Sequence, residues 1–342
     1  MRERQKRRVF RSVAGTVLLT AALLLSFAFF HHVLPLQLAR RQSARQVVPT
    51  AAPVAVTPAP ELSGETPAPV EEDGRSQWQI RFADHFTDEV VVTDSSYSSP
   101  NLAIDITRHT VGEGRGQSVY FVADVYLGDP SLFGACLAGD NFAYGYTEDV
   151  ATVSEAHGAI LAINGDNYCF QYQDENSVTV RDGVVYRAGE YSTADICVLF
   201  ADGTMETYAP GAYDFETLMA QGARHIWHFG PALVDENGQA VSGLDAAYWG
   251  ISYGNPRSAV GYYEPGHYCF LVADGRDIGY SVGLKLSQLA EIMAELGCRS
   301  AYNLDGGASS VMYFNGQRVN RQSNGAGRGV GDILYLTDKT GE

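Results

Sequence analysis

Residues 283–316 read GLKLSQLAEIMAELGCRSAYNLDGGASSVMYFNG, and the order of patterns in this stretch decides the fold class. Apolar side chains first recur at helical spacing, at Leu286, Leu289, Ile292, Met293 and Leu296. This spacing predicts an amphipathic helix with Ser287 as its N-cap and Gly297 as its end. A short apolar run follows and predicts a strand that ends at Asn303. An Asn-Gly pair at 315–316 then predicts a hairpin.

Similar turn signals divide much of the remaining chain into short strands. Asn-Gly and Asp-Gly pairs supply the positive φ angles that type I′ turns require. They follow alternating or β-branched runs at Asp182-Gly183, Asp202-Gly203, Asn237-Gly238 and Asn315-Gly316. Two further helices are expected near residues 147–156 and 214–220. We therefore predict an α+β domain with a mixed, largely antiparallel β-sheet and a few packed helices.

The N-terminal region predicts a single transmembrane helix ahead of this domain. Residues 1–12 carry six basic side chains and one acid, and residues 13–37 contain no Asp, Glu, Lys or Arg. A bilayer core takes about 20 apolar helical residues, so residues 13–37 are long enough to anchor the chain in a membrane. The basic tail favours an N-terminus inside the cell and a domain outside it. A cleaved signal peptide is the alternative, although its apolar region is normally shorter.

Residues 38–75 are rich in Pro and Ala and predict an extended linker, which leaves residues 76–342 as one domain with a large core.

The formal net charge is −16, and residues 1–47 carry nine bases and one acid, so the remainder holds about −24. Such an acidic surface disfavours nucleic acid as a partner. Five scattered cysteines without metal-site spacing disfavour zinc, and Cys197 and Cys269 lie in apolar runs typical of buried thiols.

Three apolar runs end at a carboxylate beside glycine. They end at Asn164-Gly165-Asp166, at Asp274-Gly275-Arg276, and at a segment from Asn303 that contains Asp305. Glycine lets the backbone approach a ligand closely, and strand ends commonly form binding clefts. Each of these ends taken alone favours an ordinary turn. If the three lie side by side, their carboxylates and amides converge on one site.

Groups suited to anions accompany these ends. Small residues follow the third carboxylate at Gly306, Gly307, Ser309 and Ser310. Successive backbone N–H groups in such a segment can form an anion-binding nest. Three arginines suited to phosphate stand in or near the same motifs: Arg257, Arg276 and Arg328. His228 is also close to them in sequence, but its aromatic neighbours favour a packed structural histidine, as they favour core packing for Trp227.

These segments occur in an order that resembles the phosphodiester glycosidase family. The matching segments are AINGDNY at 162–168, FGPALV at 229–234, NPRSAVG at 255–261, LVADGR at 271–276, the stretch 283–316, and GRGVGDILYL at 327–336. The resemblance covers about residues 147–336, and the long block ending in LDGGASS is its specific part. Two departures stand out. The family often has Asn-Gly-Gly-Phe-Phe where this chain has NGDNY, and a third glycine where this chain has Ala308.

The resemblance implies an enzyme, a glycosidase that hydrolyses the bond between a sugar anomeric carbon and a phosphodiester. The implied substrate is a phosphorylated saccharide or glycopolymer of the cell envelope, such as an N-acetylglucosamine-1-phosphodiester in exopolysaccharide or teichoic acid. We assign Asp166 or Asp305 as base or nucleophile and Arg257 as a catalytic cation. The other candidates would bind substrate: Asn164, Gly165, Asp274, Arg276, Asn303, Gly306, Gly307, Ser309, Ser310, Arg328 and His228.

No cofactor is required by these residues, although Asp and Asn oxygens would suit a divalent cation such as calcium. Two other functions fit the same scaffold. One is a non-catalytic domain that binds cell wall or polysaccharide. The other is a metal-dependent phosphodiesterase that cleaves P–O bonds instead of C–O bonds.

Overall fold

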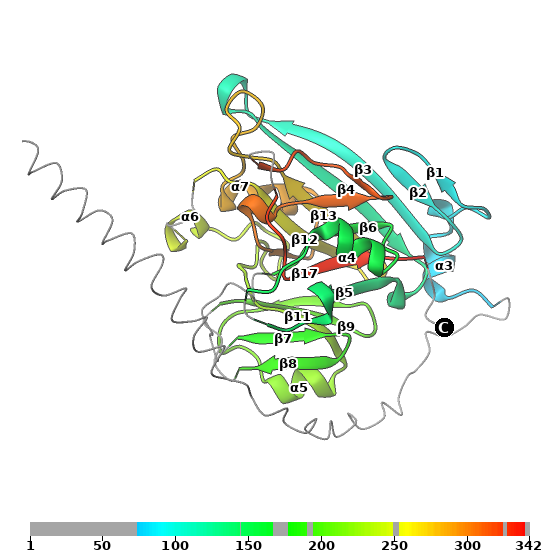
Figure 1. Cartoon of the computed structure of the whole chain (residues 1–342). Helices are drawn as coiled ribbons and strands as arrows, with labels where there is room; N and C mark the ends of the chain where they lie inside the picture. The colour runs from blue at the N-terminus through cyan, green and yellow to red at the C-terminus, as the bar shows by residue number, and fades with distance from the viewer. Residues whose placement is uncertain are drawn as a thin grey trace, which may run out of the picture. The chain divides into compact units, whose positions relative to one another are not determined.

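Three antiparallel sheets form the framework of the protein (Figure 1). The computed structural model describes residues 74–143, 145–166, 177–189, 194–248, 253–323 and 327–338, and all of these belong to one compact unit. The largest sheet has seven strands in the order β1-β2-β3-β4-β13-β12-β14. Their bounds are β1 (Val91–Val92), β2 (Ser96–Ser98), β3 (Leu102–Val111), β4 (Ser118–Leu127), β13 (His267–Ala273), β12 (Arg257–Glu264) and β14 (Ser300–Asn303).

The other two sheets have five strands each. The second sheet runs in the order β10 (Met205–Tyr208), β9 (Ile196–Phe200), β11 (Ala223–Trp227), β7 (Val178–Arg181) and β8 (Val184–Ala188). The third sheet runs in the order β16 (Gln317–Arg318), β15 (Met312–Phe314), β6 (Leu161–Asn164), β17 (Asp332–Leu336) and β5 (Phe133–Leu137). Every strand pair in the described part of the chain is antiparallel.

The described helices are short, and three of them pack on the sheets. The α-helices are α3 (Gln77–Arg81), α4 (Val150–Ala156), α5 (Phe215–Ala220), α6 (Leu244–Ala247) and α7 (Leu286–Glu295). Single 3₁₀ turns are η2 (Ala83–His85), η3 (Gly114–Gly116), η4 (Pro130–Leu132), η5 (Ala138–Asp140) and η7 (Gly307–Ser309). Helix α7 buries its apolar face against the seven-stranded sheet, α4 packs on the third sheet, and α5 packs on the second.

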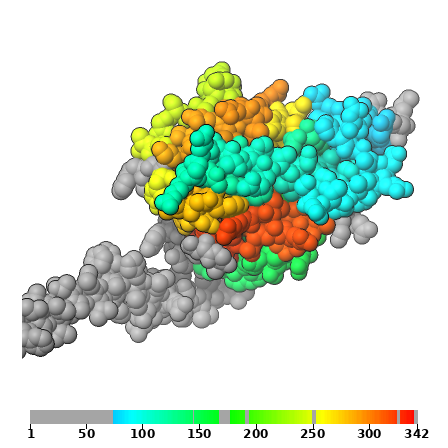
Figure 2. Space-filling view, turned by 90° about the horizontal axis from the view of Figure 1, so that it is seen from above, coloured from blue at the N-terminus to red at the C-terminus, as the bar shows by residue number. Residues whose placement is uncertain are grey.

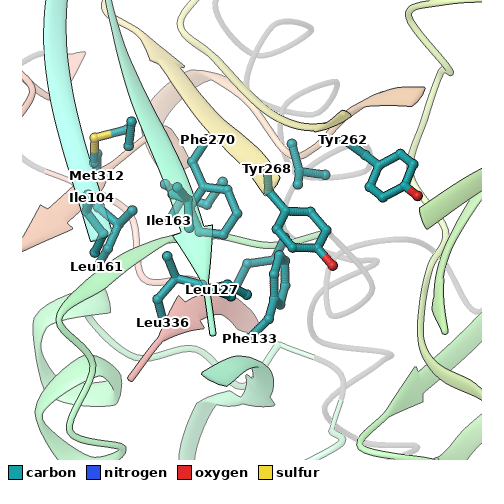
Figure 3. Close-up of a cluster of buried hydrophobic side chains, with 14 of the residues drawn as sticks. Ile104, Leu127, Phe133, Leu161, Ile163, Tyr262, Tyr268, Phe270, Met312 and Leu336 are labelled. Carbon is teal, nitrogen blue, oxygen red and sulfur yellow. The ribbon is translucent and has the colours of Figure 1, made fainter. Parts of the chain in front are cut away.

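The main core lies where the three sheets face one another, and each sheet contributes side chains to it. Figure 3 shows part of this cluster, in which Phe133 of β5 lies between Tyr268 and Phe270 of β13. The ring centroids are 5.2 and 5.5 Å apart in edge-on arrangements that aromatic pairs favour. Strand β13 has both faces buried, because Phe270 enters this core while Cys269 and Leu271 enter the cluster under α7. That double burial explains its continuous apolar sequence.

The structure confirms the predicted α+β class, with antiparallel sheets and few helices. The helix predicted from residues 283–316 is present, and Gly297 follows it with a positive φ of 84°. Its predicted N-cap is wrong: the helix begins one residue before Ser287, and Lys285 is the N-cap. The backbone N–H of Lys285 donates to the side chain of Gln288, while the Ser287 hydroxyl donates to Asp245 instead. Helices α4 and α5 begin after Asp149 and Asp214, within the predicted segments.

The four predicted turns divide into two kinds. Asp182-Gly183 and Asn315-Gly316 have positive φ at both residues, as type I′ turns require. At Asp202-Gly203 and Asn237-Gly238 only the glycine has positive φ. The carboxylate of Asp202 accepts the N–H of Thr204, and that of Asp235 accepts the N–H of Asn237. These side-chain bonds shape the turns locally, so a second left-handed residue is not needed.

The predicted transmembrane segment, residues 13–37, lies outside the described residues. Among the residues that the structure describes, no helix combines the length and the apolar character needed to cross a membrane.

The topology brings the three polar strand ends to one region. Strands β13 and β14 both pair antiparallel with β12, so they end at the same edge of the sheet, at the position where β12 begins with Arg257. Strand β6 ends at Asn164 beside the start of β17, because Ile333 pairs with Asn164. The backbone N–H of Asp305 donates to the carbonyl of Gly165 at 3.1 Å and joins the two sheets at this point.

Candidate functional site

The side-chain amide of Asn164 connects several segments of the site by hydrogen bonds. Its Nδ2 donates to the carbonyl of Asp305 at 2.7 Å and to that of Gly165 at 3.3 Å. Its Oδ1 accepts from the Ser258 hydroxyl at 2.7 Å and from the N–H of Val311 at 3.2 Å. All four hydrogen-bonding positions of this buried amide are therefore used within the protein. Asn164 positions the segment around Asp305 and has no remaining group for a sugar hydroxyl.

Asp305 presents the carboxylate at the surface of this junction. Its Oδ1 accepts the N–H of Gly306 at 2.9 Å, and its Oδ2 pairs with Arg328. Its side chain is 12% exposed, and that of Arg328 is 39% exposed. Burial raises the pKa of Asp305 above its ordinary value, and Arg328 and Ser309 oppose this shift. Asp305 is thus a carboxylate with a positive partner and access to solvent.

A second carboxylate, Asp166, lies in a buried ion cluster instead. Its Oδ2 is 3.1 Å from Nη2 of Arg181, which also lies 2.5 Å from Oδ2 of Asp332. Both carboxylate side chains are 0% exposed. Burial lowers the pKa of Arg181, but Asp332 and Asp166 reverse that effect and hold it above its ordinary value. Burial also raises the pKa of Asp332 against the attraction of Arg181. One permanent cation therefore serves two carboxyl groups.

Arg181 uses its whole guanidinium group in this cluster. Its Nη1 donates to the carbonyl of Ile226 at 2.6 Å, and the group lies over the Trp227 ring at 5.3 Å from the centroid. Asp332 in turn lies directly against Gly165, where any Cβ would overlap its carboxylate. Gly165 is therefore required for space beside Asp332. Its predicted role in substrate binding stays a prediction.

Arg257, which follows Pro256 in the sequence, and Arg276 form a second group of cations. Arg257 is buried, and its Nε donates to the carbonyl of Leu284 at 3.0 Å. Burial lowers its pKa to about 10, Asp245 partly offsets this, and Arg276 adds to it. Arg276 is exposed and donates from Nε and Nη2 to Oδ1 of Asn255, at 3.1 and 3.0 Å. With its pKa at about 10, Arg257 still carries a positive charge at neutral pH.

The 3₁₀ turn η7 contacts both Arg276 and Arg328. The Arg276 guanidinium covers Gly307, with Nη2 only 2.9 Å from the position a Cβ would occupy there. Arg328 donates from Nε to the Ser309 hydroxyl at 2.9 Å. Two exposed arginines thus lie on one short turn next to Asp305.

The predicted nest of backbone donors is not formed. The N–H of Gly306 donates to Asp305, and that of Gly307 donates to the carbonyl of Pro256 at 2.9 Å. The N–H groups of Ser309 and Ser310 donate within the turn. The local carbonyls and Asp305 already accept these bonds, so these four N–H groups are not directed toward a ligand. Ala308 has no positive φ, so its methyl group is tolerated where the family often has glycine.

The remaining predicted residues support the site from behind. Asp274 is buried and accepts from Tyr280 and Asn320, at 2.8 and 2.9 Å. Burial raises its pKa, and these hydrogen bonds oppose the rise. Asn303 is buried and donates to the carbonyl of Gly230 at 2.7 Å, while its Oδ1 has no hydrogen-bond partner among the described residues.

His228 reaches the site through its backbone, because its N–H donates to Oδ2 of Asp166 at 3.2 Å. Its side chain is buried, as are those of His225 and Trp227, which agrees with the structural histidine and core tryptophan expected from the sequence. Ser310 is also buried, and its hydroxyl has no hydrogen-bond partner among the described residues.

The structure therefore gathers the predicted residues into one region but divides them by access to solvent. Arg276 and Arg328 are exposed, and the side chain of Asp305 retains 12% exposure beside Arg328. The other members are more deeply buried: Asn164, Asp166, Arg257, Asp274 and Asn303. Sequence reasoning did not identify Arg181, Asp332, Asn255, Ser258 and Asn320, which hold these residues in place.

No group of three or more His, Cys, Asp or Glu side chains in the described ranges is arranged to hold a metal ion. Asn167 and Tyr168, which complete the first motif, lie outside the described residues.

A separate cavity of about 340 Å³ lies between β3–β4 and the hairpin of β15 and β16. Its floor is apolar, with Ile106, Phe121 and Phe314, and its walls carry Arg108 and Arg318. Figure 2 shows the teal segment that contains β3 and β4 running beside the orange-red C-terminal segment on this face. None of the predicted site residues lines this cavity, so the polar cluster around Asp305 and not the cavity is the candidate site.

Comparison with known proteins gives a consistent result. A family model described as phosphodiester glycosidase matches residues 157–337. The SPbeta prophage-derived uncharacterized protein YomE of Bacillus subtilis strain 168 is 29% identical over 193 residues, which are 56% of this chain and 30% of that relative. The chain thus spans less than a third of the length of this curated relative.

Two of the solved structures that are similar to this one illustrate the likeness. The first is the catalytic domain of zebrafish N-acetylglucosamine-1-phosphodiester alpha-N-acetylglucosaminidase, auto-inhibited by its pro-peptide, with a TM-score of 0.56 and 17% identity. The match covers 73% of this chain and 88% of that domain, and it shows a common fold. The second is a hypothetical protein from Synechocystis, with a TM-score of 0.46, 16% identity, and coverage of 73% of this chain and 64% of that one.

Replacing Arg181 with methionine should destabilise the protein strongly. The variant leaves Asp166 and Asp332 buried without their cation, and breaking such a pair typically costs about 3–5 kcal/mol. Urea unfolding measures the effect. Arg224→Met is the matched control, because Arg224 pairs with Asp182 at the surface and such pairs contribute below about 1 kcal/mol. If Arg181→Met fails to fold, Arg181→Lys should recover part of the stability. Equal effects at positions 181 and 224 would contradict this account.

Proposed function

Because the chain belongs to the phosphodiester glycosidase family, we propose that it hydrolyses the bond between a sugar anomeric carbon and a phosphodiester. The substrate class is a glycosyl-1-phosphodiester of the N-acetylglucosamine type, carried by a phosphorylated saccharide or glycopolymer of the cell envelope. The catalytic-domain match supports the fold on which this chemistry is proposed.

One observation carries the proposal: two exposed arginines meet the most accessible carboxylate of the cluster on a single turn. Arg276 covers Gly307, and Arg328 bonds both Ser309 and Asp305. A phosphate held by the two guanidinium groups would lie next to Asp305. Guanidinium groups suit phosphate because their planar N–H donors match its oxygens in pairs.

The chemistry needs few groups because phosphate is a good leaving group. In ordinary glycosidases one carboxylic acid protonates a poor alkoxide leaving group, and a second carboxylate acts as nucleophile or base. Here the C1–O bond breaks with its electron pair passing to the phosphate oxygen, whose charge the arginines neutralise. The carboxylate of Asp305 either attacks C1 or takes a proton from the water that does. In both routes the water oxygen ends on the sugar.

Asp305 is assigned this role over Asp166 on grounds of access. Asp166 is 0% exposed in its side chain and is held by Arg181, whereas the side chain of Asp305 is 12% exposed beside a surface arginine. Arg257 lies behind Pro256, where its buried charge adds to the positive potential at η7 without contact with solvent. Each donor aimed at charge that develops in the transition state is typically worth about 3–4 kcal/mol.

The proposal includes a location outside the cytoplasm, with the chain tethered by residues 13–37. The basic tail at residues 1–12 and the uncharged stretch after it support this orientation. Protease added to intact cells should digest the domain and leave a cytoplasmic marker intact. Digestion only after the cells are opened would contradict an outward-facing domain.

Hydrolysis in [¹⁸O]water tests the reaction itself. The full chain in detergent is incubated with the methyl phosphodiester of N-acetylglucosamine 1-phosphate, and mass spectrometry follows the label at early times. We expect label in N-acetylglucosamine and unlabelled methyl phosphate, because the proposed cleavage breaks the C–O bond. Free sugar incubated without protein corrects for spontaneous oxygen exchange at C1.

Asp305→Asn is the control for this experiment and should lower turnover by roughly 10³-fold or more without loss of folded structure. Asp277→Asn, at a half-exposed carboxylate paired with Arg321, should leave turnover unchanged. Label in the phosphate would favour a phosphodiesterase. Measurable binding without turnover across a panel of glycosyl phosphodiesters would favour a binding domain.

The pH profile of kcat/KM should report the environment of Asp305. Because burial raises its pKa, activity should fall on the acidic side with a midpoint above the ordinary aspartate value of about 3.9. Arg328 stabilises the ionised form, so Arg328→Met should move this midpoint to still higher pH. Arg321→Met removes an exposed arginine paired with Asp277 and should leave the midpoint unchanged. A midpoint that stays fixed or moves to lower pH in Arg328→Met would separate Arg328 from Asp305.

A further inference from the structure

Two cysteine sulfur atoms lie next to each other under α7. Cys269 is on β13, and Cys298 lies between α7 and β14. The Sγ atoms are 3.7 Å apart, and the two residues are 0% and 1% exposed. Both belong to the apolar cluster between α7 and the seven-stranded sheet. Cys136 and Cys197 are also buried, but they belong to two other clusters.

The strand between them is shaped to hold both sulfur atoms. Gly261 of β12 pairs with Cys269 on one side and with Ala301 on the other. A Cβ at Gly261 would lie 2.6 Å from Sγ of Cys298 and 2.7 Å from Sγ of Cys269. Gly261 has no positive φ, so its backbone does not require glycine. Glycine inside a strand normally weakens the strand. At position 261 the missing side chain leaves space for the two sulfur atoms and for the methyl group of Met293.

We propose that Cys269 and Cys298 form a disulfide bond in the exported protein. The two thiols give up two hydrogen atoms to a disulfide of a thiol oxidant, either a small molecule or an oxidoreductase, which is reduced to two thiols. A sulfur–sulfur bond is about 2.05 Å long, so the pair must close by less than 2 Å. Closure also requires the two Cα atoms to lie within the roughly 4.4–6.8 Å that a disulfide spans. The inference depends on the proposed location outside the cytoplasm, where disulfides persist.

The environment of the pair dictates when the bond forms. The contact with Cys298 raises the pKa of Cys269, and burial adds to this. The thiolate is the reactive species in disulfide exchange, so the folded dithiol reacts slowly. The bond therefore forms while the chain folds. Once formed, it is shielded from reductants until the domain unfolds.

The bond would join the strands that carry two of the site motifs. Strand β13 leads directly to Asp274, and β14 leads to Asn303 and Asp305. The two cysteines are 29 residues apart in sequence, with Cys269 in β13 and Cys298 in the segment between α7 and β14. A covalent link at this point fixes the spacing of the two strand ends on which the site is built.

Peptide mapping tests the bond without any substrate, so its outcome is independent of the proposed reaction. The full chain is isolated from cell membranes in N-ethylmaleimide, unfolded in guanidinium with fresh reagent, and digested without reduction. We expect one disulfide-linked peptide pair that contains Cys269 and Cys298, and alkylated Cys136 and Cys197. Alkylation of both Cys269 and Cys298, or their linkage to other cysteines, would overturn the proposal.

Thermal unfolding provides the second readout. Protein unfolded and refolded in a phosphine reductant should melt lower than oxidised protein, by on the order of 5–10 °C. The double variant Cys269→Ala and Cys298→Ala removes the bond, so its melting temperature should not respond to this treatment. An equal response of the wild type and the double variant would contradict a stabilising disulfide.

Discussion

The structure around the site depends on one buried contact, that of Arg181 with the carboxylates of Asp166 and Asp332. Arg181 ends β7 of the second sheet, whereas Asp166 follows β6 and Asp332 begins β17 of the third. The guanidinium also bonds the carbonyl of Ile226, so it links two sheets through several atoms. Taking charges out of water is costly, and only close pairing offsets that cost. The pairing thus fixes how the two sheets meet, and with it the position of Gly165.

Short backbone contacts connect the position of Gly165 to that of Asp305. Gly165 accepts the N–H of Asp305, and Asn164 bonds the carbonyl of the same residue. On the opposite side, Gly306 approaches the carbonyl of Pro256 so closely that a Cβ would lie 2.8 Å from it. Asp305 is therefore held from both sheets, by groups that cannot move independently of the strands. Sites built on strand ends are held more precisely than sites on long loops.

The sequence predicted the strand ends that carry Asn164, Asp274 and Asp305, because each apolar run stops abruptly at a polar group beside glycine. It did not reveal Asp332 or Arg181. Asp332 precedes its apolar run, and in an antiparallel sheet the start of one strand lies beside the end of its neighbour. A polar residue at the start of a strand therefore marks the same sheet edge as a polar residue at the end of the neighbouring strand. Arg181 stands at the end of an alternating strand before Asp182-Gly183, a pattern typical of a surface residue. Only the tertiary contact with Trp227 and the two carboxylates makes it buried, and periodicity carries no information about such pairs.

The net charge of the chain determines how much the two arginines at η7 must offset to hold an anion. A surface with a net charge of about −24 beyond residue 47 repels an anionic substrate, but its charges are spread over the whole molecule. Screening at physiological salt limits their reach to about 8 Å. A phosphate in contact with Arg276 and Arg328 would lie about 3 Å from two cations, well inside that distance. Contact therefore outweighs the global repulsion at this turn. The same repulsion opposes the adsorption of phosphorylated polymers wherever carboxylates predominate on the surface.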